Sequence, residues 1–196
     1  MKKDMRERIM ESAITIFARK GFFETTVDDI ARAAKVAKGT IYLYFRDKSD
    51  IYINILEWQL SSALADLQAV SKEKLSSTQR LRRIAEDWLL HSVDFHRFFP
   101  VISMENINQA LKIMKEVKKR VFPIIGQIIC SVANIIDEGI KNGEFRKINS
   151  RIAAISFLNI MRAPLLLNLF TSEKVASSEE ILSLFFEGLK NRKELK

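Results

Sequence analysis

The sequence predicts an all-α protein of about nine helices. Only 3 prolines and 6 glycines occur in 196 residues, and apolar residues recur every three to four positions along most of the chain. No stretch shows the sustained alternation of apolar and polar residues that is typical of a strand. With 47% hydrophobic residues, the chain can bury a full core without covalent crosslinks.

The first helix is expected at about residues 4–19. Ile9, Ala13 and Phe17 follow one another at a spacing of four residues and form an apolar stripe along one side. The helical pattern ends near Gly21, and glycine is a common residue just after a helix. This helix is therefore amphipathic and buries one face.

Two short helices follow and predict a helix-turn-helix. Thr26 is expected to cap the first of them with its hydroxyl, while Asp29 reaches back in a capping box. The second runs over residues 38–44, with Ile41 and Phe45 four positions apart on its core face. Two short helices joined by a turn of about three or four residues are typical of this motif.

Longer helical stretches are expected at about residues 48–70, 76–96, 108–142, 150–170 and 178–193. Asp47 or Ser49 is the candidate cap of the first stretch, and the cluster Ser76-Ser77-Thr78 starts the second. Pro123 is expected to kink the third stretch and Pro164 the fourth. With these kinked stretches included, the expected helices number about nine.

The balance of charges is basic. The chain has 32 Lys and Arg against 24 Asp and Glu, a formal charge of +8. Such an excess favours encounter with polyanions, although many basic proteins never bind DNA. Cys130 is the only cysteine, so an intramolecular disulfide is excluded, and it is expected to be a small core residue of a protein in a reducing compartment.

A cytoplasmic location without a membrane partner is expected. The first eight residues carry charges throughout and lack the apolar region of a signal peptide. Charged or amide side chains interrupt every apolar run before it reaches the roughly 20 residues of a membrane span.

The segment from Gly21 to Tyr52 reads GFFETTVDDIARAAKVAKGTIYLYFRDKSDIY. Its Thr-Thr-Val, its Ala-x-Val turn and its Lys-Gly-Thr-Ile-Tyr-x-Tyr-Phe run resemble the DNA-binding signature of the TetR/AcrR family of transcriptional regulators. The resemblance implies a DNA-binding domain at residues 1–47 and a ligand-binding and dimerisation domain at residues 48–196. It also implies a homodimeric repressor that binds a palindromic operator and is released by a small effector.

The third helix has the side chains that DNA reading requires. Gly39 lets the backbone approach DNA closely, because it has no side chain. Thr40 can hydrogen-bond a base edge or a phosphate, and Leu43 can contact a thymine methyl group. We therefore expect this helix to enter the major groove.

The resemblance implies further DNA contacts. Tyr42 and Tyr44 would contact phosphates or bases, Lys38 and Lys48 would pair with phosphates, and Thr26 would present its backbone amide to a phosphate at the helix N-terminus. Each residue also has a purely structural interpretation. The tyrosines would be half-buried packing residues, Thr26 a cap alone, and the lysines solvated surface charges.

Two positions depart from the family pattern. Lys35 stands where glycine is common, and a left-handed conformation at a residue with a side chain costs on the order of 1 kcal/mol. Ala37 stands where a serine often caps the next helix, and the loss of such a cap costs about 1 kcal/mol. Neither change removes an expected DNA contact.

Aromatic, methionine and histidine side chains in the second domain are candidates for an effector pocket. They are Trp58, Trp88, His91, Phe95, Met104, Phe122, Phe157 and Met161. Their alternative interpretation is an ordinary core. His91 and His96 are five residues apart, about 140 degrees around a helix, so they do not share a metal ion, and no cofactor is expected.

The last two helices are expected to form the homodimer contact, as they do in the family. Their apolar residues are Ile152, Ile155, Leu158, Leu165, Leu166, Leu169, Ile181, Leu182, Leu184, Phe185 and Leu189. A two-fold dimer implies a palindromic operator, because each half-site then meets an identical protomer.

An enzyme is not expected, since the chain has no phosphate-binding glycine loop, nucleophile elbow or HExxH motif. The rival interpretation is a helical module that binds proteins. The effector is expected to be a hydrophobic or amphipathic molecule, a fatty acyl compound or a drug-like xenobiotic. The sequence leaves open the operator, the regulated genes, and whether the effector is an inducer or a corepressor.

Overall fold

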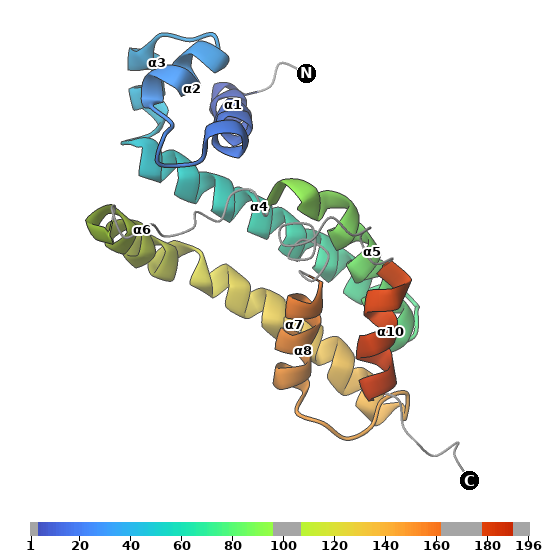
Figure 1. The fold of residues 1–196 in the computed structure, drawn as a ribbon. Helices are drawn as coiled ribbons and strands as arrows, with labels where there is room; N and C mark the ends of the chain where they lie inside the picture. Colours follow the sequence, from blue (N-terminus) through green and yellow to red (C-terminus); the bar gives the residue numbers. More distant parts are fainter. Residues whose placement is uncertain (1–3, 96–106, 162–177, 190–196) are drawn as a thin grey trace. The chain divides into compact units, whose positions relative to one another are not determined.

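The computed structural model describes residues 4–95, 107–161 and 178–189. Within these ranges the chain forms nine α-helices and no β-strand (Figure 1), which confirms the predicted all-α class. Several residues named above lie outside the described ranges: His96, Met104, Pro164, Leu165, Leu166 and Leu169.

The helices are, in chain order, α1 (Met5–Lys20), α2 (Val27–Ala33), α3 (Lys38–Tyr44), α4 (Lys48–Ser71), α5 (Ser77–Phe95), α6 (Ile107–Arg120), α7 (Phe122–Lys141), α8 (Ser150–Ile160) and α10 (Ser178–Leu189). The bounds of α3 are the predicted ones. The long stretch around Pro123 is divided into two helices, α6 and α7. Pro123 is the second residue of α7, where its missing N–H removes no intrahelical bond.

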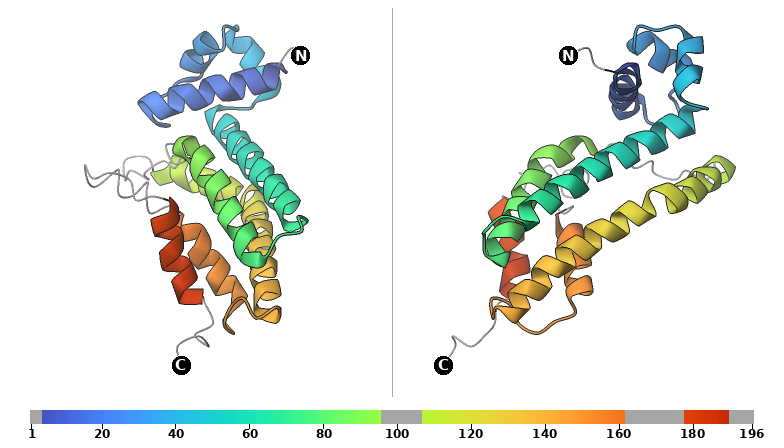
Figure 2. Two further views of the ribbon diagram at one scale, coloured as in Figure 1. Left: turned by 90° about the vertical axis from the view of Figure 1, so that its right-hand side faces the viewer. Right: turned by 180° about the vertical axis from the view of Figure 1, so that it is seen from behind.

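The chain divides into two compact units. The first comprises Met1–Ser61 with Asp94–Ile124, and the second comprises Ser62–Val93 with Ile125–Lys196. Helices α4 and α7 each contribute residues to both units. In the first unit, α1, α2 and α3 gather at the N-terminal end of α4, as the two views of Figure 2 show. We call α1, α2 and α3 the head.

An aromatic cluster joins the head to α4. The ring centroids of Phe17 and Phe22 are 5.5 Å apart, those of Phe22 and Tyr52 5.1 Å, and those of Phe17 and Tyr52 6.0 Å. All three side chains are buried, and burial raises the pKa of the Tyr52 hydroxyl. Each buried aromatic ring contributes about 1.5–3 kcal/mol to folding. The first turns of α4 are therefore part of the core of the head.

The start of α5 in the second unit is capped from two sides. Ser76 and Gln79 form a capping box, in which Gln79 N donates to Ser76 Oγ at 3.2 Å and Ser76 N donates to Gln79 Oε1 at 3.0 Å. The backbone amides of Ser77 and Thr78 each donate to the carboxylate of Glu144 at 3.0 Å. Burial alone would raise the pKa of Glu144, but these hydrogen bonds keep it below its usual value. The predicted helix start at this cluster is confirmed.

By length and composition alone, helix α7 could cross a membrane. No other helix in the described ranges is both long and apolar enough to do so. One face of it is buried, with Ile128, Val132, Ile135 and Ile136 at helical spacing. Polar side chains lie on the exposed face, including Gln127, Asn134, Asp137 and Glu138. This two-faced arrangement is typical of a helix that packs in a protein core.

The expectation that Cys130 lies in the core is wrong, because its side chain is exposed. Cys130 is two residues from Ile128 and two from Val132, and two residues correspond to about 200 degrees around a helix. Since Ile128 and Val132 define the buried face of α7, Cys130 lies on the opposite one.

Helices α8 and α10 pack against each other through aromatic rings. The centroids of Phe157 and Phe185 are 5.1 Å apart, and both side chains are buried. Ile152, Ile155 and Leu184 on the same two helices remain exposed. The pair therefore has a buried side and an exposed apolar side.

Gly139 on α7 leaves no room for a side chain. A Cβ atom at this position would lie 2.3 Å from Cδ2 of Phe145 and 2.9 Å from Cβ of Ser77. Glycine at this point lets α7 approach the loop that follows it and the start of α5.

We predict that Gly139→Ala lowers the free energy of unfolding by about 1–3 kcal/mol, because the added methyl group overpacks a closed contact. Gly126→Ala on the same helix is the matched control, since nothing lies within 4 Å of a Cβ atom there. That substitution should leave stability unchanged or raise it by up to about 1 kcal/mol. Urea unfolding followed by circular dichroism measures both changes, and an equal effect of the two would contradict the packing argument.

Candidate nucleic-acid interface

The capping box at the start of α2 is present as predicted. Asp29 N donates to Thr26 Oγ1 at 3.1 Å, and Thr26 N donates to Asp29 Oδ2 at 3.1 Å. The Thr26 hydroxyl also donates to Asp29 Oδ2 at 2.8 Å, and Lys20 forms an ion pair with Asp29 at 3.2 Å. These contacts, those of Thr26 first, lower the pKa of Asp29 to about 2. The Thr26 amide, predicted to face a phosphate, is thus engaged by Asp29.

The turn between α2 and α3 has the two features expected from its sequence. Lys35 has a φ of 53°, the left-handed conformation that costs a side-chain-bearing residue on the order of 1 kcal/mol. Ala37 is the N-cap of α3 and supplies no side-chain hydrogen bond. The turn is held by backbone contacts, among them Val36 N to Ala31 O at 3.0 Å.

Helix α3 has one buried face and one exposed face. Ile41 is 1% exposed and the adjoining Phe45 is 2% exposed. On the other side Tyr42 is 50% exposed, Leu43 82% and Tyr44 42%. The inner face fixes the helix in the head, so the outer face presents large side chains to the surroundings at a defined angle.

Gly39 lies on α3 without a structural reason to be glycine. Its φ is not positive, and nothing lies within 4 Å of a Cβ atom built there. Neither backbone conformation nor packing inside the protein therefore requires it. A close approach by another molecule, the remaining reason for glycine on an exposed helix surface, fits the predicted DNA contact.

Lys38 forms an ion pair with Asp28, with 2.7 Å between Nζ and Oδ2. Hydrogen bonding to Asp28 raises the pKa of Lys38. About half of each side chain is exposed, and exposed pairs of this kind contribute little to stability. Lys38 can therefore exchange Asp28 for a phosphate at small cost.

Lys48 has partners that the sequence did not predict. Its ammonium donates to the carbonyl oxygens of Phe22 at 2.6 Å, Phe23 at 3.0 Å and Thr25 at 2.7 Å, and it lies 4.5 Å from the centre of the Phe22 ring. Burial lowers the pKa of Lys48. Because an ammonium has three N–H donors, all of them are used inside the protein. A phosphate contact by Lys48 would require one of these bonds to break.

The candidate pocket residues fall into different environments. Trp58 and Phe122, in the first unit, are about half exposed. Phe157 and Met161, in the second, are buried, and Phe157 packs on Phe185 as a core residue does. The side chains of Trp88, His91 and Phe95 on α5, like the whole of Met104, lie outside the described part of the chain. The pocket therefore remains a prediction.

Residues 9–55, which span the helix-turn-helix and the start of α4, match the family model of bacterial regulatory proteins of the tetR family. The fatty acid metabolism regulator protein of Bacillus subtilis is 25% identical over 189 residues, covering 94% of this chain and 95% of its own. A biofilm operon regulator of Staphylococcus aureus, IcaR, is 42% identical over 48 residues, 24% of this chain and 26% of its own.

Residues 9–55 of the chain therefore carry the DNA-binding region of the tetR family of bacterial regulatory proteins. The relatives that match over most of its length are transcriptional regulators and not enzymes.

Solved structures share the fold over nearly the whole chain. The Bacillus subtilis regulator FadR, in complex with stearoyl-CoA, superposes with a TM-score of 0.75 at 22% identity, covering 93% of this chain and 98% of its own. FadR from Bacillus halodurans gives a TM-score of 0.71 at 19% identity and covers 100% of both chains.

We predict that Lys48→Met lowers the free energy of unfolding by roughly 1–3 kcal/mol, because three carbonyl groups lose a charged donor. Lys38→Met removes the same charge from an exposed pair and should leave stability nearly unchanged. Denaturant unfolding compares the two variants. If Lys48→Met left stability unchanged while weakening DNA binding, Lys48 would be a phosphate contact rather than a structural one.

Proposed function

We propose that this regulator is a ligand-responsive repressor that binds a palindromic operator as a homodimer in the cytoplasm. Residues 1–47 read the DNA, and residues 48–196 bind the effector and form the dimer. The outer face of α3 carries this proposal, because Tyr42, Leu43 and Tyr44 are exposed around a Gly39 that the fold itself does not require.

The proposed DNA contacts are those of a recognition helix. Gly39 admits the sugar-phosphate backbone, Thr40 and Leu43 face base edges, and Tyr42 and Tyr44 flank them. Lys38 exchanges its ion pair with Asp28 for a phosphate. Thr26 and Lys48 hold the surrounding backbone in place through the contacts described above.

The homodimer is proposed to form through α8 and the C-terminal helices. Ile152 and Ile155 on α8 and Leu184 on α10 are large apolar side chains exposed on helices whose other sides are buried. A two-fold contact of this kind places identical heads on successive major grooves, about 34–36 Å apart. The operator would accordingly be a palindrome.

The proposed effector is a long-chain fatty acyl compound that acts as an inducer. One similar protein of Bacillus subtilis is named a fatty acid metabolism regulator, and the similar solved structure of Bacillus subtilis FadR contains stearoyl-CoA. An effector that prefers the non-binding state by about 1–3 kcal/mol lowers operator affinity about 5- to 150-fold.

Selection of bound sequences from a random duplex pool tests the DNA-reading proposal. We expect an enriched palindrome for the purified wild-type protein, and we expect Tyr42→Ala to weaken binding to it by about 1–3 kcal/mol. Gly39→Ala is the sharper variant. It should leave thermal stability unchanged or slightly higher, because alanine favours helices, while it weakens operator binding.

Parallel thermal melts separate folding from recognition in this experiment. Reduced stability of Gly39→Ala would show that the glycine serves the fold. The absence of any enriched sequence would contradict the repressor proposal, unless enrichment returned with effector present, which would make the effector a corepressor.

Titration of the operator complex with stearoyl-CoA tests the effector proposal. We expect operator affinity to fall about 5- to 150-fold, with free coenzyme A as the control that lacks the acyl chain. Equal effects of the two compounds would assign recognition to the nucleotide, and no effect of either would exclude acyl-CoA as the effector.

A further inference from the structure

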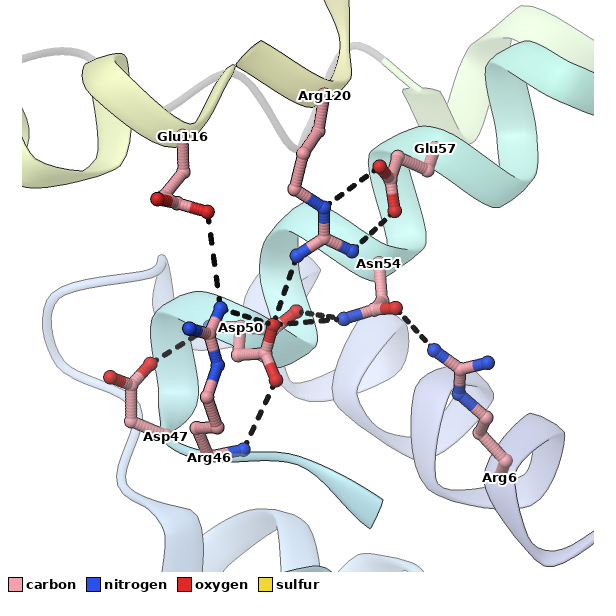
Figure 3. A network of polar contacts seen from close by, with 8 residues as sticks. All are labelled: Arg6, Arg46, Asp47, Asp50, Asn54, Glu57, Glu116 and Arg120. Atoms are coloured by element: carbon pink, nitrogen blue, oxygen red, sulfur yellow. Dashed lines mark hydrogen bonds and ion pairs between the residues drawn. The ribbon is translucent and has the colours of Figure 1, made fainter. Parts of the chain in front are cut away.

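A network of polar side chains lies where the head meets α4 and α6, all within the first unit (Figure 3). We call it the Asp50 network. Its members are Arg6, Arg46, Asp47, Asp50, Asn54, Glu57, Glu116 and Arg120.

Asp50 is the centre of the network. Its carboxylate accepts hydrogen bonds from Arg46 N at 3.1 Å, Arg46 Nη2 at 3.2 Å, Asn54 Nδ2 at 3.1 Å and Arg120 Nη1 at 3.0 Å. Only 11% of the side chain is exposed. Burial would raise its pKa, but the hydrogen bonds from Arg46 and Arg120 lower it. A charged carboxylate is therefore retained at this point by donors from several segments.

Arg120, the last residue of α6, binds two acidic residues of α4 at once. Its Nε donates to Glu57 Oε1 at 2.8 Å and its Nη2 to the other oxygen of Glu57, while Nη1 reaches Asp50. Asp50 and Glu57 are seven residues apart, which places them two turns apart on one side of α4. The planar guanidinium with its fork of donors suits this arrangement, and a lysine would not.

The remaining members connect the head to the same centre. Asn54 donates to Asp50 and accepts a hydrogen bond from Arg6 of α1. Arg46, just after α3, lies 3.9 Å from Glu116 of α6. Figure 3 shows these side chains converging from α1, α4, α6 and the segment between α3 and α4. One carboxylate thus joins both ends of the head to α6.

We infer that Arg120 is a positioning residue for operator binding. By joining α6 to Asp50 and Glu57 it fixes the position of the head and the start of α4 relative to α6. Partly buried ion pairs add little to stability relative to apolar packing, whereas their directional hydrogen bonds define one geometry. Two heads of a dimer bind a palindrome together only if each holds that geometry. This inference rests on the proposed function, since it requires a dimer on a palindrome.

Arg120→Met is the test variant, and Lys119→Met is its matched control. Both remove one positive charge from the end of α6, but Lys119 is exposed there. Each protein is titrated with the full palindromic operator and with a duplex that contains a single half-site. For Arg120→Met we expect a loss of about 10-fold or more on the palindrome and, on the half-site, only the slight loss that removal of one charge causes. Lys119→Met should change both affinities equally and slightly.

Three outcomes would overturn the inference. Equal losses on palindrome and half-site would mean that Arg120 supports the fold of the head itself. If the slope of operator affinity against salt concentration fell by the amount expected for one lost phosphate contact, Arg120 would be a direct DNA contact. Unchanged affinity for the palindrome would mean that the position of the head does not depend on Arg120.

Glu57→Gln is the second variant, in case Arg120→Met fails to fold. It removes the bidentate partner while leaving Asp50 in place, and it makes the protein more positive, so general attraction to DNA should rise. We nevertheless expect Glu57→Gln to lose affinity for the palindrome and not for the half-site. The absence of this selective loss would count against the inference. Wild-type protein that did not prefer the palindrome to the half-site would instead refute the homodimer proposal, which separates the two failures.

Discussion

Burial of Ile41 and Phe45 is the constraint on which the proposed DNA-reading surface depends. A helix of seven residues is not stable alone, because too few hydrogen bonds form to offset the cost of nucleation. Apolar packing of its inner side against the head therefore holds α3 in place. The outer residues contribute little to this packing, so a helix this short can expose Tyr42, Leu43 and Tyr44 without losing its structure.

Polar contacts then set the direction in which this helix is presented. Lys48 closes the loop between α1 and α2 by binding three carbonyl groups, and the Asp50 network joins the head to α6. Both groups of contacts involve the first three turns of α4 and the segments packed against them. Apolar packing thus supplies the stability of the head, while charged groups with directional hydrogen bonds supply its orientation.

Features governed by local rules could be predicted from the sequence. The bounds of α3, the capping box at Thr26 and the left-handed Lys35 all depend on residues within a few positions of one another. The partners of Lys48 and Arg120 could not, because they lie 23 to 26 and 63 to 70 residues away. A long charged side chain has many acceptors within reach, and only the fold selects among them. Cys130 shows a different error, since helical spacing from Ile128 already indicated an exposed position.

Helix α4 is one uninterrupted helix, and its length makes the position of one end sensitive to a tilt about the other. Its 24 residues give a length of roughly 36 Å at 1.5 Å per residue. A tilt of about 5 degrees about one end moves the other by roughly 3 Å, close to the rise of about 3.4 Å between base pairs of a DNA strand. A tilt of this size would therefore shift a head by about one base pair along the proposed operator.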